Sequence, residues 1–332
     1  MEIPVFCFPQ KCYTESMEAL RKKQLKNEIN LLSLALIVYT LVTYAVVTGD
    51  LLLRVTLNRL LPGDFTEGLL LASSDSAWSE IAASLLGILV LFCFSRPQIR
   101  FADVFRTRQR MPFTLFTEVL CVFASCQLIT VWMDDLLEYC LNLIGFTLSE
   151  SVEQATASST NLSQLLFACV MAPVGEEIVY RGFCMKRLQG QGHLFAIVLS
   201  ALLFGVMHAN LAQMAFAFLV GLILGFVAIE YSVLYAIALH VINNFLFGDL
   251  LSFAYNAAPD ALFSMVFYFL FGVLFFCAVL VLVQRRKQIA AYIRAHRPEK
   301  GAYGSALTSV LLLVFIAMNL VLSLLLIRPL QA

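Results

Sequence analysis

Nine stretches of the chain carry little or no charge and approach or reach the length needed to cross a lipid bilayer. They cover residues 29–49, 77–95, 112–133, 161–180, 194–209, 211–229, 232–248, 261–283 and 305–327. A spanning helix needs about 20 consecutive apolar residues, and the second and fifth stretches are the weakest. The sequence therefore predicts an all-α, polytopic transmembrane helix bundle with about nine spans, or eight if one weak stretch does not cross.

The overall composition agrees with a membrane protein and excludes several other classes. Hydrophobic residues make up 61% of the 332 residues and charged residues 13%, whereas about a quarter of a soluble domain is charged. The formal net charge is zero, so we expect no nucleic-acid partner. With no repeat and no soluble segment, residues 1–332 form a single integral membrane domain whose surroundings are the lipid bilayer.

Basic residues are distributed unevenly between the two sets of loops. Nineteen of the 22 Lys and Arg residues fall in segments 1–28, 96–111, 181–193, 230–231 and 284–304. Because cytoplasmic loops are enriched in Lys and Arg, this asymmetry predicts a cytoplasmic N-terminus, an external C-terminus and an odd number of spans. The predicted location is a multi-pass position in a membrane, which would be the plasma membrane in a bacterium. Segments 50–61 and 134–146 would lie flat at the outer interface as short amphipathic helices.

Five polar residues interrupt the apolar stretches in the middle of the chain. They are Glu176, Glu177, His208, His240 and Asn244. Ionisable side chains at membrane depth are costly and usually mark a functional interior. Acids and imidazoles are also the groups that activate water by taking its proton. The pattern therefore favours a water-activating hydrolase inside a bundle of membrane helices.

The two adjacent glutamates are expected to have different roles. Successive residues on a helix point about 100° apart, so both carboxylates cannot face one site. Glu177 and Arg181 are four residues apart with the acid first, the favourable order for an ion pair. We therefore predict that Glu176 does chemistry and that Glu177 and Arg181 pair in support.

The depth of Glu176 requires a long fourth helix. If that helix ended near residue 180, Glu176 and His208 would lie at very different heights in a hydrocarbon layer of about 30 Å. Extending the helix to about Leu188 places Glu176 near mid-depth and makes residues 189–193 a cytoplasmic turn. The remaining histidines, His193 and His296, fall in or near basic loops and receive no site role.

These residues fit three kinds of site. In the first, Glu176 and His208 deprotonate a water that attacks a peptide carbonyl, while His240 and Asn244 stabilise the oxyanion. In the second, His208, His240 and Glu176 hold one divalent metal such as zinc, although no HExxH motif is present. In the third, the same groups form the proton or ion pathway of a transporter.

Three short motifs in this region resemble those of a known protease family. Glu-Glu-x-x-x-Arg at 176–181, Phe-x-x-x-His at 204–208 and His-x-x-x-Asn at 240–244 resemble the motifs of the CPBP intramembrane proteases. That group includes CAAX proteases and Abi-like bacterial proteins linked to bacteriocin processing and immunity. The resemblance covers about 161–250, which would be a catalytic core of four helices.

The resemblance implies an enzyme that hydrolyses a peptide bond of a membrane-associated peptide or protein. It implies that Glu176 is the essential acid, that His208 activates water, and that His240 and Asn244 complete the site. It also leaves open whether the endopeptidase uses a metal. The alternative is a catalytically silent membrane scaffold or bacteriocin-immunity partner that keeps the fold and binds another membrane protein.

Overall fold

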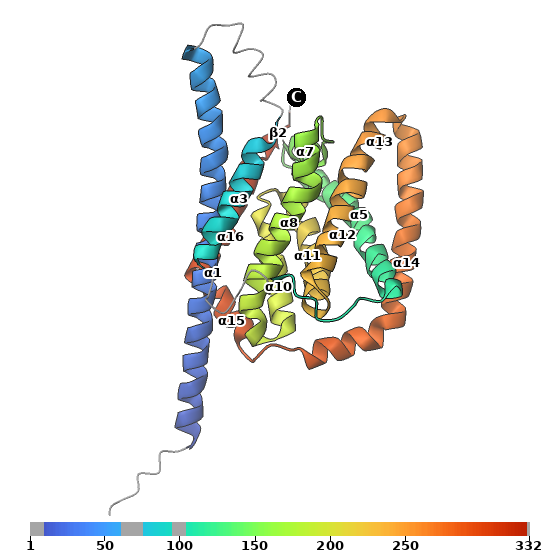
Figure 1. Ribbon diagram of the computed structural model, residues 1–332. Coiled ribbons are helices and arrows are strands. Elements are labelled where there is room, and N and C mark those ends of the chain that lie inside the picture. The colour runs from blue at the N-terminus through green and yellow to red at the C-terminus, as the bar shows by residue number, and fades with distance from the viewer. Residues whose placement is uncertain (1–9, 61–75, 95–103, 331–332) are drawn as a thin grey trace, which may run out of the picture.

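The computed structural model describes residues 10–60, 76–94 and 104–330, and they form a bundle of helices (Figure 1). The first half contains α1 (Gln10–Leu60), α3 (Trp78–Cys93), α5 (Phe113–Asn142) and α6 (Ser149–Thr156). A continuous helical rod follows, made of α7 (Leu162–Leu166), η1 (Phe167–Met171), α8 (Ala172–Glu177), η2 (Ile178–Met185), α9 (Lys186–Leu188) and η3 (Gln189–Gln191). The second half contains α10 (His193–Met207), α11 (Leu211–Glu230), α12 (Val233–Ile242), η4 (Asn243–Leu250), α13 (Leu251–Ala257), α14 (Asp260–Ala295), α15 (Ala302–Leu307) and α16 (Val310–Leu324).

The segments rich in basic residues meet at one end of the bundle, called here the basic end. Side-chain contacts join them pairwise: Arg21 to Glu299 at 3.5 Å, Arg108 to Gln189 at 3.0 Å, and His193 to Glu230 at 3.0 Å. The segments that the sequence assigns to one side of the membrane therefore share one end of the structure.

The other loops meet at the opposite end. There, β1 (Phe146–Thr147) pairs antiparallel with β2 (Arg328–Pro329). Further contacts join Asn210 to Ser151 at 3.1 Å and the Ser159 amide to Asp249 at 2.6 Å. The described chain thus passes between the two ends nine times, as the sequence predicts for an all-α polytopic bundle.

Six of the nine crossings use helices that are long and apolar enough to span a membrane. These are 17–57, 113–142, 162–191, 211–230, 233–257 and 260–295. The other three crossings use the shorter apolar helices α3, α10 and α16. The short length of α10 is tolerated because neighbouring helices bury ten of its fifteen residues, so it need not match the thickness of the lipid. The chain is therefore an integral, multi-pass membrane protein.

The expected interfacial helices are wrong. Residues 50–60 continue α1 without a break, and residues 134–142 continue α5. In Figure 1, α1 stands along one edge of the bundle and extends beyond its other helices. An apolar face beside charged residues predicts contact with an interface, but it does not distinguish a separate helix from the end of a spanning one.

Small residues allow α10 and α11 to pack closely at the centre. A methyl group added at Gly205 would lie 2.8 Å from the carbonyl oxygen of Met214, and one at Gly221 would lie 3.2 Å from Cα of Ala201. Close backbone approach at small residues is the usual means of helix association inside membranes. This contact fixes the position of His208 at the end of α10.

Candidate active site

The helical rod that carries the two glutamates is irregular on both sides of them. The π-helical segments η1 and η2 flank α8, and Pro173 occupies the first turn of α8. Proline has no amide hydrogen to donate to the preceding turn, and the Ala172 amide donates five residues back to the Phe167 carbonyl. π-Helical turns inside helices occur frequently at functional sites.

The predicted extension of this helix is confirmed. The rod runs from Leu162 to Gln191, and Gly192 forms the following turn with a φ of 106°. Glu176 therefore lies fifteen residues from the end of the rod, and His208 lies fifteen residues from the start of α10. At 1.5 Å per residue both are about 22 Å from the same turn, which removes the difference in height.

The predicted pair of Glu177 with Arg181 is present and fully buried. Nη1 of Arg181 lies 2.8 Å from Oε1 of Glu177, and both side chains are 0% exposed. Nη2 of Arg181 donates to the carbonyl of Gly221 at 3.2 Å, and its guanidinium lies 4.5 Å from the ring centre of Phe204. The pair therefore joins the rod to both α10 and α11.

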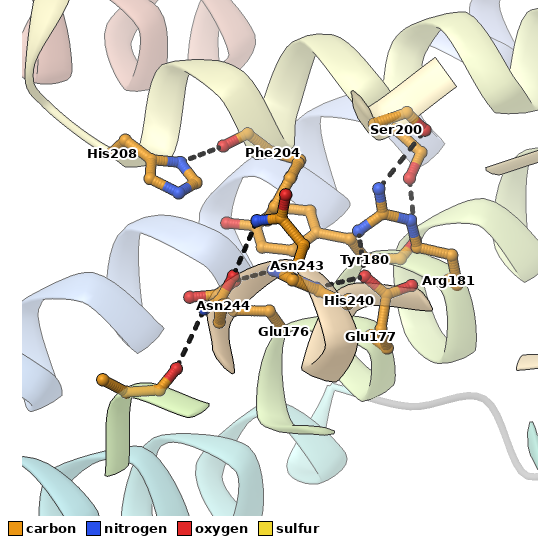
Figure 2. Close-up of polar contacts among 12 residues, drawn as sticks. Glu176, Glu177, Tyr180, Arg181, Ser200, Phe204, His208, His240, Asn243 and Asn244 are labelled. Atoms are coloured by element: carbon orange, nitrogen blue, oxygen red, sulfur yellow. Dashed lines mark hydrogen bonds and ion pairs between the residues drawn. The ribbon is translucent and has the colours of Figure 1, made fainter. Parts of the chain in front are cut away.

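Glu177 also holds His240, which the sequence did not indicate. Oε1 of Glu177 lies 2.9 Å from Nδ1 of His240, while Oε2 of Glu176 lies 3.6 Å from Nε2 of the same ring (Figure 2). His240 is 6% exposed and Glu176 is 21% exposed. One glutamate thus fixes the imidazole from the protein side, and the other faces its second nitrogen from a more open position.

A chain of amide groups extends from this site to α5. Nε2 of Gln127 donates to Oδ1 of Asn243 at 3.0 Å, and Nδ2 of Asn243 donates to Oδ1 of Asn244 at 3.0 Å. Nδ2 of Asn244 donates to the carbonyl of Ala168 at 2.9 Å. Because a carboxamide nitrogen carries two hydrogens, Asn244 retains one for another acceptor.

His208 is connected to the other site residues by its contacts with Phe204. Nδ1 of His208 lies 2.9 Å from the Phe204 carbonyl, so Nδ1 donates and Nε2 remains as an acceptor. The Phe204 ring makes edge contacts with both imidazoles, with centres 4.9 Å from His208 and 5.7 Å from His240. The next residue, Ala209, has a φ of 48°, a left-handed conformation that costs a non-glycine residue about 1–2 kcal/mol.

The structure joins some of the predicted residues directly and not others. Glu176, Glu177, Arg181 and His240 form one connected group, and Asn244 follows His240 on the next turn. Figure 2 shows His208 linked to Phe204, without an interaction that joins it to Glu176. The expected pairing of Glu176 with His208 therefore requires a water molecule or a substrate between them.

The three residues proposed as metal ligands are not gathered into a metal site. His208, His240 and Glu176 offer suitable atoms, and the Nδ1 atoms of both rings are already oriented by hydrogen bonds, as is usual for metal-binding histidines. Among the described residues, however, a different group brings three ligand atoms within 4.8 Å of one another. We therefore derive no catalytic step through a metal at Glu176.

Sequence reasoning gave no role to three residues that complete the site. Phe204 belongs to the second motif and separates the two imidazoles, while Asn243 and Gln127 support Asn244. Gln127 is a polar residue within the apolar stretch 112–133, so its depth was a signal that could have identified it. Asn243 adjoins a motif residue and carries no comparable signal.

Comparison with known proteins bears directly on this group of residues. Residues 158–246 match the family model described as type II CAAX prenyl endopeptidase Rce1-like. Over this segment the chain is similar to the CAAX-type intramembrane proteases. The matched segment contains all six predicted site residues and runs from the loop before α7 into η4. No curated protein and no solved structure matches this chain.

At family level this match supports an intramembrane CAAX-type endopeptidase, which is a hydrolase. The match begins at residue 158 and ends at residue 246, close to the core predicted at 161–250. The helices outside the match are α1, α3, α5, α6, α13, α14, α15 and α16.

Proposed function

We propose that this CAAX-type protease hydrolyses a peptide bond of a membrane-associated peptide or protein by water that Glu176 and the neighbouring imidazoles activate. The observation that carries the proposal is the position of Glu176 opposite Nε2 of His240. Glu176 is the more exposed carboxylate, and the buried Glu177 and Arg181 pair orients the ring that it faces. An available acid beside a fixed imidazole is the arrangement that general base catalysis requires.

In this proposal Glu176 accepts a proton from water while the water oxygen bonds to the carbonyl carbon of the substrate. The tetrahedral intermediate then collapses, the carbon–nitrogen bond breaks, and the proton passes to the leaving amine. Nε2 of His208 has an available lone pair because Nδ1 donates to Phe204, so His208 can accept a hydrogen bond from the same water. The products are a carboxylate and an amine.

Peptide hydrolysis also requires stabilisation of the oxyanion, which Asn244 can provide, together with His240 when Nε2 of its ring carries a proton in addition to Nδ1. The remaining hydrogen of the Asn244 amide is held in place by the bond of its partner hydrogen to Ala168. A preorganised donor of this kind typically contributes about 2.7–4 kcal/mol to the transition state. Asn243 and Gln127 keep the amide oriented, so Asn244 would not have to reorganise during the reaction.

The experiment compares peptides from membranes that contain the wild-type chain, Glu176→Gln, or the control Glu150→Gln. Glu150 is 55% exposed and pairs with Arg328 at the end of the bundle opposite the basic end, outside the candidate active site. We expect cleaved membrane-associated peptides with the wild type and the control, and none with Glu176→Gln. Identical peptide profiles for all three would contradict the proposal.

The same variants test the alternative of a scaffold or immunity partner. If Glu176→Gln fully restores the phenotype of a deletion strain, hydrolysis is not the task of this protein. A non-enzymatic partner would need the fold but not the carboxylate, since Glu176→Gln keeps the size and shape of the side chain.

A further inference from the structure

The basic end contains a second group of potential metal ligands, separate from the candidate active site. His193 begins α10, Glu230 ends α11, and His296 follows α14. Their ligand atoms lie within 4.8 Å of one another, and all three residues are partly exposed. We propose that His193, Glu230 and His296 form a binding site for a divalent metal ion of the zinc type.

The distances inside this group suit a small metal ion. Nδ1 of His193 lies 3.0 Å from Oε1 of Glu230, and two ligands of a tetrahedral zinc ion lie about 3.3 Å apart because each bond is about 2.0 Å. A metal ion would replace the proton that His193 and Glu230 share, with little separation of the two side chains. Binding would therefore release a proton.

Neighbouring hydrogen bonds already orient two of the three ligands. Nδ1 of His296 donates to the Tyr292 carbonyl at 3.0 Å, which leaves the lone pair of Nε2 for a metal. The Tyr292 hydroxyl donates to Oε1 of Glu230 at 2.6 Å. Hydrogen bonds of this kind around first ligands commonly determine the tautomer and basicity of metal-binding side chains.

The two imidazoles must move slightly to bind one ion. Their rings are stacked, with centres 4.7 Å apart and planes inclined by 12°, so the lone pairs of their nitrogens lie in two nearly parallel planes and do not point at a common centre. A turn of one ring about its Cβ–Cγ bond brings the lone pairs together. The side chain of His193 has room for this turn because it is 28% exposed.

The charges around the group determine which ions it can hold. Glu230 is the one carboxylate among its ligands, and Arg294 and Arg297 flank His296 in the sequence. Hard ions such as Ca²⁺ and Mg²⁺ require several oxygen ligands, whereas imidazole suits Zn²⁺ and similar metals. The site should therefore bind Zn²⁺ and not Mg²⁺.

A metal at this point would connect the C-terminal part of the chain to the catalytic core. The amide of Leu194 donates to the His296 carbonyl at 3.4 Å. A methyl group added at Gly192 would lie 3.3 Å from the carbonyl oxygens of His296 and Arg297, so this turn and the end of α14 are in close contact. In Figure 1, the last part of α14 runs along the lower edge of the bundle towards α10 and α15.

The site is distinct from the candidate active site. His193 and His208 lie at opposite ends of α10, about 22 Å apart along the helix axis. Zinc found in the purified protein would therefore not by itself identify a catalytic metal. The proposal stands or falls independently of the hydrolase, because its test measures metal binding alone.

The test titrates Zn²⁺ into the full chain, purified in detergent without a histidine tag and stripped by a chelator. The wild type is compared with His193→Asn/His296→Asn, with Tyr292→Phe, and with the active-site variants Glu176→Gln and His208→Asn. Calorimetry gives the affinity, elemental analysis gives the stoichiometry, and size-exclusion chromatography confirms that each variant is folded. Mg²⁺ is titrated in parallel.

We expect the double histidine variant to lose one Zn²⁺ per chain, and Tyr292→Phe to bind about tenfold or more weakly because an orienting hydrogen bond is gone. Glu176→Gln and His208→Asn should retain that ion with unchanged affinity. Equal binding by the wild type and the double variant, loss of the ion in the active-site variants alone, or no stoichiometric binding by the wild type would each overturn the proposal.

Discussion

Oε1 of Glu177 lies 2.9 Å from Nδ1 of His240 and 2.8 Å from Nη1 of Arg181. Because a carboxylate only accepts hydrogen bonds, Nδ1 of His240 carries a proton and Nε2 is the atom that faces Glu176. Two adjacent glutamates therefore lie on different nitrogens of one imidazole. The first is available for chemistry, and the second holds the ring.

This division predicts that Glu176→Gln removes activity and spares stability. The contact of Glu176 with His240 is 3.6 Å long, beyond the range of a hydrogen bond, so its loss should change the free energy of unfolding by less than about 1 kcal/mol. Loss of a general base typically costs 10²–10⁴-fold in rate. Peptide hydrolysis and thermal unfolding of the same detergent-solubilised sample measure both quantities.

Glu177→Gln, in contrast to Glu176→Gln, should clearly lower the stability of the protein. Removing its charge leaves Arg181 buried and uncompensated at 0% exposure, which typically costs about 3–5 kcal/mol. We expect a clear decrease in melting temperature that Glu176→Gln does not show. The double variant Glu177→Gln/Arg181→Met should recover part of the loss, because no charge then remains buried. Equal melting temperatures for the two single glutamine variants would contradict this division.

The sequence predicted the fold because its signals were physical and local. Charge-free stretches determine the crossings, and the uneven distribution of Lys and Arg correctly groups segments such as 181–193 and 284–304 at one end. The requirement that Glu176 and His208 share a depth predicted the helix to Leu188. The sequence analysis did not predict the length of α1, because a hydropathy pattern shows where a helix crosses the membrane and not where the helix ends beyond the membrane surface.

The sequence analysis named residues for the candidate site, but it did not predict most of the contacts between them. The spacing of Glu177 and Arg181 gives their pair because both lie on one helix. The contact of Glu177 with His240 joins residues 63 positions apart, and only the packing of the rod against α12 creates it. The group at His193 was missed for the same reason, because its three ligands come from three helix ends.

The orientation of the bundle predicts which loops a membrane-impermeant thiol reagent can label. Cysteines introduced at Lys300, on the basic end, and at Thr156, on the opposite end, are both exposed in the structure. In intact cells we expect labelling of Thr156→Cys and not of Lys300→Cys, above the background of the unmodified chain. In opened cells both should be labelled. The reverse pattern in intact cells would place the N-terminus outside.

Close packing of α10 against α11 predicts that Gly205 cannot be enlarged. The Cβ of Gly205→Ala would lie 2.8 Å from the Met214 carbonyl oxygen, and the helices would have to separate, at a typical cost of about 1–3 kcal/mol. Gly272→Ala is the matched control, because α14 offers nothing within 4 Å of the added methyl and alanine favours helix by about 1 kcal/mol. In unfolding experiments in detergent, Gly205→Ala should therefore be less stable than the wild type, and Gly272→Ala should be more stable. Separation of α10 from α11 would also shift Phe204 and with it both imidazoles, so Gly205→Ala should lower peptide hydrolysis while Gly272→Ala leaves it unchanged.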